Sequence, residues 1–143
     1  MPTVSIDLAT NYQTDATVRN HTLRADEPEH AGGDDTGPTP VEMLLASIGS
    51  CMAITMKLYA GRKKWPLKRV EIEIENKKVK PEDCPDYENK DGRKDLVMIT
   101  SQIRLHGDLT DEQKTRIAEI GGRCPVHKIV EKGAYFVDEL TLE

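Results

Sequence analysis

The sequence has few aromatic residues: they make up 4% of the chain, which has one tryptophan and one phenylalanine. With 37% hydrophobic residues in 143 positions, the chain has little bulky material for a large core. Its length predicts one domain over residues 1–143. Residues 40–62 nevertheless form a segment that is apolar on almost every side, and such a helix must be buried against something. A partner subunit could supply the cover that the rest of the chain lacks.

Basic residues are outnumbered by acidic ones, 20 to 25, and the net charge is −5. Binding to a phosphate backbone or to an anionic membrane surface requires clustered lysine and arginine. The one short basic run, residues 61–64, follows the end of the predicted helix, where basic side chains complement the helix dipole. The sequence therefore predicts no nucleic-acid partner and no membrane-surface partner.

A secretory leader is not expected, because the first residues alternate like a strand, and we expect a cytoplasmic protein. Ser47, Ser50, Thr55 and Lys57 interrupt the longest apolar stretch, so we predict no membrane span. Cysteine is scarce and its count, three, is odd. In a reducing cytosol this excludes a structural disulfide framework and leaves buried, reactive or metal-binding thiols.

Alternation of apolar and polar residues with period two predicts several antiparallel strands. The first three are short and form a meander, and two longer ones are half-exposed, with a long polar loop between them. An acidic segment rich in glycine and proline, residues 26–38, is predicted to be a loop. The predicted strands are 3–10, 15–20, 21–26, 67–79, 96–107 and a closing strand at 134–142.

Three helix starts carry local signals. Thr39 with Glu42 and Thr110 with Gln113 match the capping box, in which the two side chains satisfy free backbone N–H groups. Pro125 stands at the first position of a third helix, with a cysteine just before it. The predicted helices are 40–62, 110–120 and one that begins at Pro125. Because strands and helices are segregated along the chain, the expected fold class is α+β.

The cysteines differ in what could activate them, since a thiol reacts as its thiolate. Cys51 lies deep within its helix, so composition alone favours a packing role, and reactivity would need a nearby cation. Cys124 stands at a helix start beside Arg123, and both features are expected to stabilise negative charge. Cys84 has no visible activator. Cys124 and His127 have a metal-ligand spacing, but no second close pair of ligands exists, so we expect no metal.

Two segments together resemble the OsmC/Ohr family, the osmotically inducible and organic hydroperoxide resistance family of thiol peroxidases. They read GGDDTGPTPVEMLLASIGSCMAITMKLYAGRK and LTDEQKTRIAEIGGRCPVHKIVEKG. The resemblance spans nearly the whole chain and is closest to the branch with the GPxPxELLLAxxGxC and CPVH forms. It implies an OsmC-like fold, an intertwined homodimer with antiparallel sheets wrapped around long central helices.

The resemblance also implies a chemistry without a cofactor. In the family, the cysteine that matches Cys51 attacks an organic hydroperoxide and becomes a sulfenic acid, and the one that matches Cys124 condenses with it to a disulfide. An external dithiol, lipoyl or thioredoxin-like, then reduces the disulfide. The family's activating arginine comes from the N-terminal strands, so Arg19 and Arg24 are the candidates, and Arg19 is expected nearer the family's strand position.

The family's glutamate, which holds this arginine, has no direct match. Val41 occupies its place and Glu42 follows one residue later. On an ideal helix Glu42 and Cys51 are about 13.5 Å apart along the axis and point to opposite sides. A capping role for Glu42 is therefore favoured over a catalytic one, which would need a bent helix start or a partner chain. A non-enzymatic OsmC-like module, sensing oxidation or binding an apolar ligand, remains the alternative function.

Overall fold

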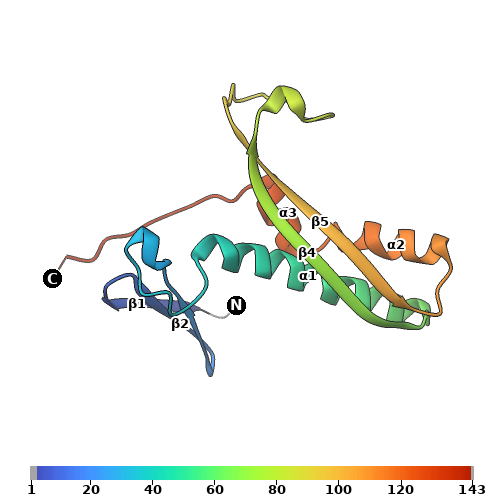
Figure 1. Ribbon diagram of the computed structural model, residues 1–143, viewed down its shortest axis with the longest axis horizontal. Helices are drawn as coiled ribbons and strands as arrows, with labels where there is room; N and C mark the ends of the chain where they lie inside the picture. Colours follow the sequence, from blue (N-terminus) through green and yellow to red (C-terminus); the bar gives the residue numbers. More distant parts are fainter. Residues whose placement is uncertain (1–2, 143) are drawn as a thin grey trace. The chain divides into compact units, whose positions relative to one another are not determined.

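The computed structural model describes residues 3–142, which form two compact units that divide after Ala46 (Figure 1). Antiparallel strands occur in both units, and three α-helices are found within the described residues. The predicted α+β class is therefore confirmed.

The first unit contains the predicted meander. Its strands are β1 (Val4–Thr10), β2 (Gln13–Val18) and β3 (His21–Ala25), paired antiparallel in that order. β2 and β3 are joined by the two-residue turn Arg19–Asn20, and Arg19 has φ +52°. A short 3₁₀ helix, Glu29–Ala31, lies in the segment predicted to be a loop. The alternation of apolar and polar residues thus predicted these three strands, and the loop that follows them contains one turn of 3₁₀ helix.

A buried carboxylate, Asp26, fixes the path of the chain after β3. Its side chain is 1% exposed and accepts hydrogen bonds from the Glu27 N–H (2.7 Å) and from the Thr36 N–H (3.0 Å) and hydroxyl (2.6 Å). The Asp26 N–H donates to the carbonyl of Pro38 at 3.1 Å. These bonds hold the loop immediately before the long helix, and those from Thr36 and Glu27 lower the pKa of Asp26.

The stability that Asp26 contributes is expected to depend on pH. Because the folded pKa of Asp26 lies below the ordinary value of 3.8, its ionised form stabilises the fold above pH 3.8, and this contribution is lost as the pH falls from there through the folded pKa. Urea unfolding of the wild type and of Asp26→Asn should show a stability gap at pH 6 that closes below pH ~4. Asp7→Asn, on the exposed strand β1, is the control. A gap that does not change with pH would contradict this role.

The helix α1 (Pro40–Lys63) begins at the predicted capping box. The Glu42 N–H donates to Thr39 Oγ1 at 3.2 Å, and the Thr39 N–H donates to Glu42 Oε1 at 2.8 Å. One face of α1 is buried, and another remains open, with Ile54 and Leu58 60% and 63% exposed. The buried positions are Ile48, Met52, Met56 and Ala60.

By length and composition α1 could cross a membrane, since an 18-residue window reaches a mean hydropathy of 1.5. The polar residues that interrupt this apolar stretch therefore do not bring its mean hydropathy below that of a possible membrane span. A single helix of this kind is weak evidence for a span, because core helices of soluble proteins also reach such values. Only 17% of the window is buried within the chain, so most of this apolar helix lacks cover.

The second unit packs a two-stranded ribbon and two helices against the Ser47–Lys63 part of α1 (Figure 1). β4 (Leu67–Val79) and β5 (Leu96–Gly107) pair antiparallel along their whole length, as predicted. A short 3₁₀ helix (Pro81–Asp83) lies in the loop between them. The chain continues with α2 (Asp111–Gly121) and α3 (Pro125–Lys132). The ribbon turns its apolar face to the core through Val70, Ile72, Ile74, Ile99, Ile103 and Leu105.

α2 starts at the second predicted capping box. The Gln113 N–H donates to Thr110 Oγ1 at 3.1 Å, and the Thr110 N–H donates to Gln113 Oε1 at 3.0 Å. At its other end α2 approaches α1 closely, because a Cβ at Gly121 would lie 2.3 Å from Met56 Cε. Ile117 and Met56 are both fully buried here.

Loss of the Ile117 side chain is expected to cost stability, because its neighbours cannot fill the space that it leaves. Ile117→Ala should lower the free energy of unfolding by about 2–5 kcal/mol. Urea denaturation followed by circular dichroism measures this. Ile129→Ala is the matched control, since Ile129 is 57% exposed and should change stability far less. Equal losses in both variants would contradict the assignment of Ile117 to the core.

The closing strand predicted at 134–142 is not formed. The segment has no strand assignment, and its apolar side chains are exposed, Tyr135 by 93% and Phe136 by 80%. Alternation predicts which side chains share a face, but a strand also needs a neighbouring edge that satisfies its backbone hydrogen bonds. The described chain does not pair this segment with such an edge.

Candidate active site

Two of the three cysteines belong to one apolar cluster of the second unit. Cys124 is one of its fully buried members, and Cys51 packs against it and is half-buried. The walls come from α1, β4 and α2, through Ile48, Met52, Met56, Ala60, Leu67 and Ile117. The fold thus places two thiols, far apart in the sequence, in the same water-poor region.

Cys124 holds its position as the N-cap of α3. Its Sγ accepts a hydrogen bond from the His127 N–H at 3.4 Å, and Pro125 at the first helical position needs no hydrogen-bond acceptor. The helix start predicted from the sequence is therefore confirmed. A sulfur atom here takes the place of the oxygen that usually caps a helix.

The helix start favours the Cys124 thiolate, as expected, but the net effect of its surroundings is the opposite. Burial raises the pKa of the Cys124 thiol, and the neighbouring Cys51 thiol raises it further by hydrogen bonding and by charge. The N–H groups of His127 and Val126 act in the opposite direction without reversing the shift. Arg123 is exposed and is not among the groups that lower the pKa. Desolvation outweighs the helix end because Cys124 has no exposed surface.

Cys51 occupies the border between the buried and the open faces of α1. It packs against the cluster on one side, and it lies seven residues before Leu58, which places both on the same side of the helix. Leu58 and Ile54 are largely exposed. Within the described chain the Cys51 thiol therefore has more access to its surroundings than the Cys124 thiol.

The two candidate arginines have different positions in the first unit. Arg24 lies in β3, directly opposite Asp15 of β2, and its Nε and Nη2 donate to the two carboxylate oxygens at 2.8 and 3.1 Å. Arg19 lies in the turn, and the expectation of a strand position for it is wrong. A two-residue hairpin turn falls at this point, and the sequence alternation did not resolve it. Asp15 raises the pKa of Arg24, which stays charged.

Asp15 was not singled out from the sequence. The sequence does contain a signal for it. Once a two-residue turn fixes the register of the β2–β3 hairpin, Asp15 and Arg24 become direct cross-strand neighbours of opposite charge. Glu42, in contrast, uses its carboxylate in the capping box, and among the described residues it forms no ion pair with Arg19 or Arg24. The structure thus shows the capping role that the spacing favoured.

The remaining ligand-type side chains within residues 3–142 form no metal site. Cys84 lies in the loop after β4, with its Sγ 3.6 Å from the carbonyl of Lys80. His106 pairs with Glu71 at 2.7 Å across the ribbon. Over residues 3–142 no three His, Cys, Asp or Glu side chains are arranged to hold a metal ion.

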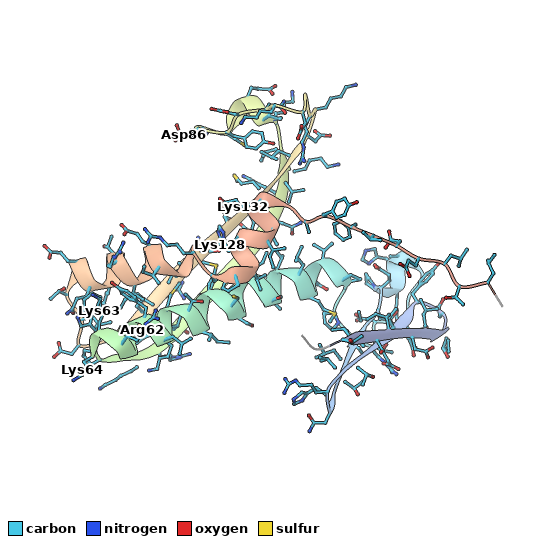
Figure 2. All side chains as sticks on the ribbon, turned by 180° about the vertical axis from the view of Figure 1, so that it is seen from behind. Arg62, Lys63, Lys64, Asp86, Lys128 and Lys132 are labelled. Atoms are coloured by element: carbon cyan, nitrogen blue, oxygen red, sulfur yellow. The ribbon has the colours of Figure 1, made fainter. Side chains whose placement is uncertain are left out.

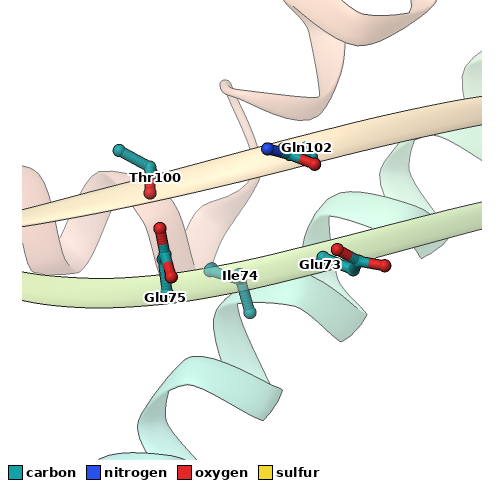
Figure 3. Close-up of a pocket in the computed structure, with 5 residues that line it drawn as sticks. All are labelled: Glu73, Ile74, Glu75, Thr100 and Gln102. Atoms are coloured by element: carbon teal, nitrogen blue, oxygen red, sulfur yellow. The ribbon is translucent and has the colours of Figure 1, made fainter.

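A hollow lies on the β4–β5 ribbon, and no cysteine lines it (Figure 3). It is lined by Glu73, Ile74, Glu75, Thr100 and Gln102. Its two carboxylates and the lack of a thiol or a basic group in its lining make it unsuited to a peroxide. The cysteine pair is the better candidate for chemistry.

Basic side chains gather at two helix ends of the second unit. Figure 2 shows Arg62, Lys63 and Lys64 at the end of α1, and Lys128 and Lys132 separately along α3. Arg62 and Lys63 in the last turn of α1, and Lys132 in the last turn of α3, complement the helix dipoles. The two groups do not merge into one basic stripe in this view.

Solved structures share this fold at low sequence identity. An OsmC-like protein from Mycoplasma pneumoniae has a TM-score of 0.71 and 16% identity, with 92% of this chain and 87% of that chain covered. A putative osmotic stress induced and detoxification response protein from Psychrobacter arcticus gives 0.70 and 19%, covering 90% and 87%. The organic hydroperoxide resistance protein OhrB of Bacillus subtilis gives 0.60 and 18%, covering 91% and 90%.

No curated protein matches the sequence. A family model described as OsmC-like protein matches residues 32–138, which include α1, the ribbon, α2, α3 and both clustered cysteines. This match covers most of the chain and crosses the division between the two units. The chain therefore belongs to the OsmC-like protein family.

Proposed function

We propose that the protein is a cytoplasmic thiol peroxidase that reduces organic hydroperoxides. The Cys51 sulfur attacks the distal peroxide oxygen, the O–O bond breaks, and the products are an alcohol and the Cys51 sulfenic acid. The Cys124 thiol then displaces water from the sulfenic sulfur, and a Cys51–Cys124 disulfide forms. An external dithiol, lipoyl or thioredoxin-like, supplies the two electrons that restore both thiols.

The observation that carries this proposal is the location of both thiols in one apolar cluster, where the Cys51 thiol raises the pKa of Cys124. A disulfide needs its two Cα atoms within about 7 Å, which cysteines on packed neighbouring elements can reach. The apolar walls favour alkyl peroxides and exclude water, which would otherwise solvate the reacting groups.

Exposure distinguishes the roles of the two cysteines. Cys51 is half-buried at the border of the open face of α1, whereas Cys124 is fully buried and its pKa is raised. A peroxide therefore reaches Cys51 first, and Cys124 acts second. The raised pKa keeps Cys124 protonated until the sulfenic acid is formed, and its proton then leaves with the water.

For the cation that favours the thiolate, we propose Arg24. It lies in an N-terminal strand, and Asp15 fixes its guanidinium by two hydrogen bonds, whereas Arg19 lies in the turn. An arginine stays charged at any physiological pH and stabilises both a thiolate and the oxygen anion that leaves from the peroxide.

A homodimer would complete the site. The exposed stripe of α1 with Ile54 and Leu58 borders Cys51, and the apolar C-terminal segment is unpaired in the described chain. A second copy that covers α1 would bury both features and close the open side of Cys51.

Leu58→Glu is therefore expected to convert a dimer into monomers, because it places a charge in the proposed helix interface. Light scattering after gel filtration measures the mass directly. Lys63→Glu, a larger charge change on the same helix, should leave the dimer intact because Lys63 lies in the last turn of α1, on the other side of the helix from Leu58. A wild-type monomer, or a dimer that tolerates Leu58→Glu, would contradict this interface.

One equivalent of cumene hydroperoxide added to the reduced protein tests the chemistry. Intact mass should fall by two hydrogens, and peptide mapping should find Cys51 joined to Cys124. Cys84 should remain alkylatable. A disulfide that includes Cys84, or three free thiols after complete mixing, would overturn the proposal.

The non-enzymatic alternative draws on the buried, protonated state of Cys124, which also suits simple packing. In that case the cluster senses oxidation or holds an apolar ligand. It predicts that peroxide consumption with dithiothreitol is no faster than in the Cys51→Ser variant, which separates the two functions.

A further inference from the structure

The reduced cysteine pair has the features of a chelating dithiol, apart from any peroxide chemistry. Cys51 and Cys124 share an apolar cluster, and the Cys51 thiol acts on the titration of Cys124. Two independent backbone elements, α1 and the start of α3, hold the sulfurs. Such a pair binds a ligand that takes two sulfurs at one atom with little loss of conformational freedom.

The number and type of protein side chains at the cysteine pair limit which atoms it can bind. Zinc requires four nitrogen, sulfur or oxygen ligands in a closed site, and residues 3–142 contain no group of three such side chains arranged for a metal. Charged thiolate complexes are also disfavoured, because Cys124 lies in a site without solvent contact. A suitable ligand must be thiophilic, satisfied by two sulfurs, and uncharged once bound.

We propose that Cys51 and Cys124 together bind trivalent organoarsenicals. With phenylarsine oxide, two As–S bonds form, the As–O bond is lost, and the two thiol protons leave with the oxygen as water. No electrons are transferred, so the step needs neither oxidant nor reductant. The adduct carries no charge, and its organic group remains in contact with apolar walls such as Met52 and Ile48.

The proposal can be tested with the reduced full-length protein and one equivalent of phenylarsine oxide. Intact mass should show one adduct, and a thiol assay should find that two of the three thiols are lost. Glutathione is then added as a competing monothiol. Two-point attachment should make the wild-type adduct about 100-fold or more resistant to glutathione than the adduct of Cys51→Ser or Cys124→Ser.

Cys84→Ser is the matched control, and its adduct should match that of the wild type. Circular dichroism of every variant checks that the fold is retained, and a Cys51→Ala variant provides a second route should serine disturb the cluster. Glutathione displacement from the wild type as easily as from the single variants, or dependence on Cys84, would overturn the proposal. Because no peroxide is used, an adduct in a protein without peroxidase activity would refute the proposed function alone.

Discussion

Replacement of Cys51 by serine is expected to abolish the reduction of cumene hydroperoxide. A hydroxyl in this apolar region cannot form the anion that attacks the peroxide, so turnover with dithiothreitol should fall to the rate of buffer alone. Peroxide consumption followed with a ferrous xylenol orange assay measures the loss. Cys84→Ser should keep the wild-type rate, because Cys84 lies in a loop away from the cluster.

Cys124→Ser should behave differently from Cys51→Ser. Its Cys51 should still react once and then remain as a sulfenic acid, which dimedone traps, or oxidise further. A rapid first turnover followed by arrest is therefore the expected signature. Equal loss in both variants, without a trapped sulfenic acid, would contradict the division of roles between the two thiols.

Replacement of Arg24 by methionine is expected to slow peroxide reduction by about 10²–10³-fold, the usual cost of the loss of one charge-stabilising donor. Methionine keeps the unbranched apolar stem of the side chain and removes the charge, so the β-meander should still form. The second-order rate constant of single-turnover Cys51 oxidation isolates the chemical step.

Arg19→Met is the matched control, and its rate should stay within a few-fold of the wild type. Asp15→Asn tests whether the loss comes from the guanidinium or from a disturbed strand pair, since it breaks the same ion pair but keeps Arg24. A large effect of Arg19→Met with none from Arg24→Met would reverse the assignment of the activating arginine.

Local rules predicted much of the fold. The capping boxes at Thr39 and Thr110 involve atoms within four residues, so the sequence specified both helix starts. Alternation specified β4 and β5 because one face of the ribbon packs on α1 and the other meets solvent. Cys124 as a helix cap followed in the same way from its place before Pro125.

The features that the sequence did not predict depend on residues that are distant in the chain. Asp26 lies in an acidic loop that reads as solvated, and its burial appears only when Thr36 folds back onto it. The raised pKa of Cys124 depends on burial, which no nearby sequence signal reports. The segment 134–142 alternates as a strand does, but alternation carries no information about which edge, if any, lies beside it.

The candidate active site could be predicted only in part from the sequence. Composition favoured packing for Cys51, and its pairing with Cys124 came from the resemblance to a family. Nothing in the local sequence brings two positions on α1 and α3 into one cluster, because that contact depends on how the ribbon and α2, which lie between them in the sequence, pack against α1. The ion pair of Arg24 with Asp15 similarly required the hairpin register.

The Cys124 sulfur both caps α3 and belongs to the proposed reactive pair, so its covalent state should affect the order of this helix. The Cys124 Sγ that takes part in any covalent step is also the atom that accepts the His127 N–H in the first turn of this eight-residue helix. Whenever that sulfur is bonded elsewhere, the helix loses part of what holds its first turn, and its amides should exchange with deuterium sooner. The oxidation state of this one sulfur atom should therefore be detectable as fraying of the first turn of α3, by limited proteolysis as well as by mass spectrometry of deuterium exchange.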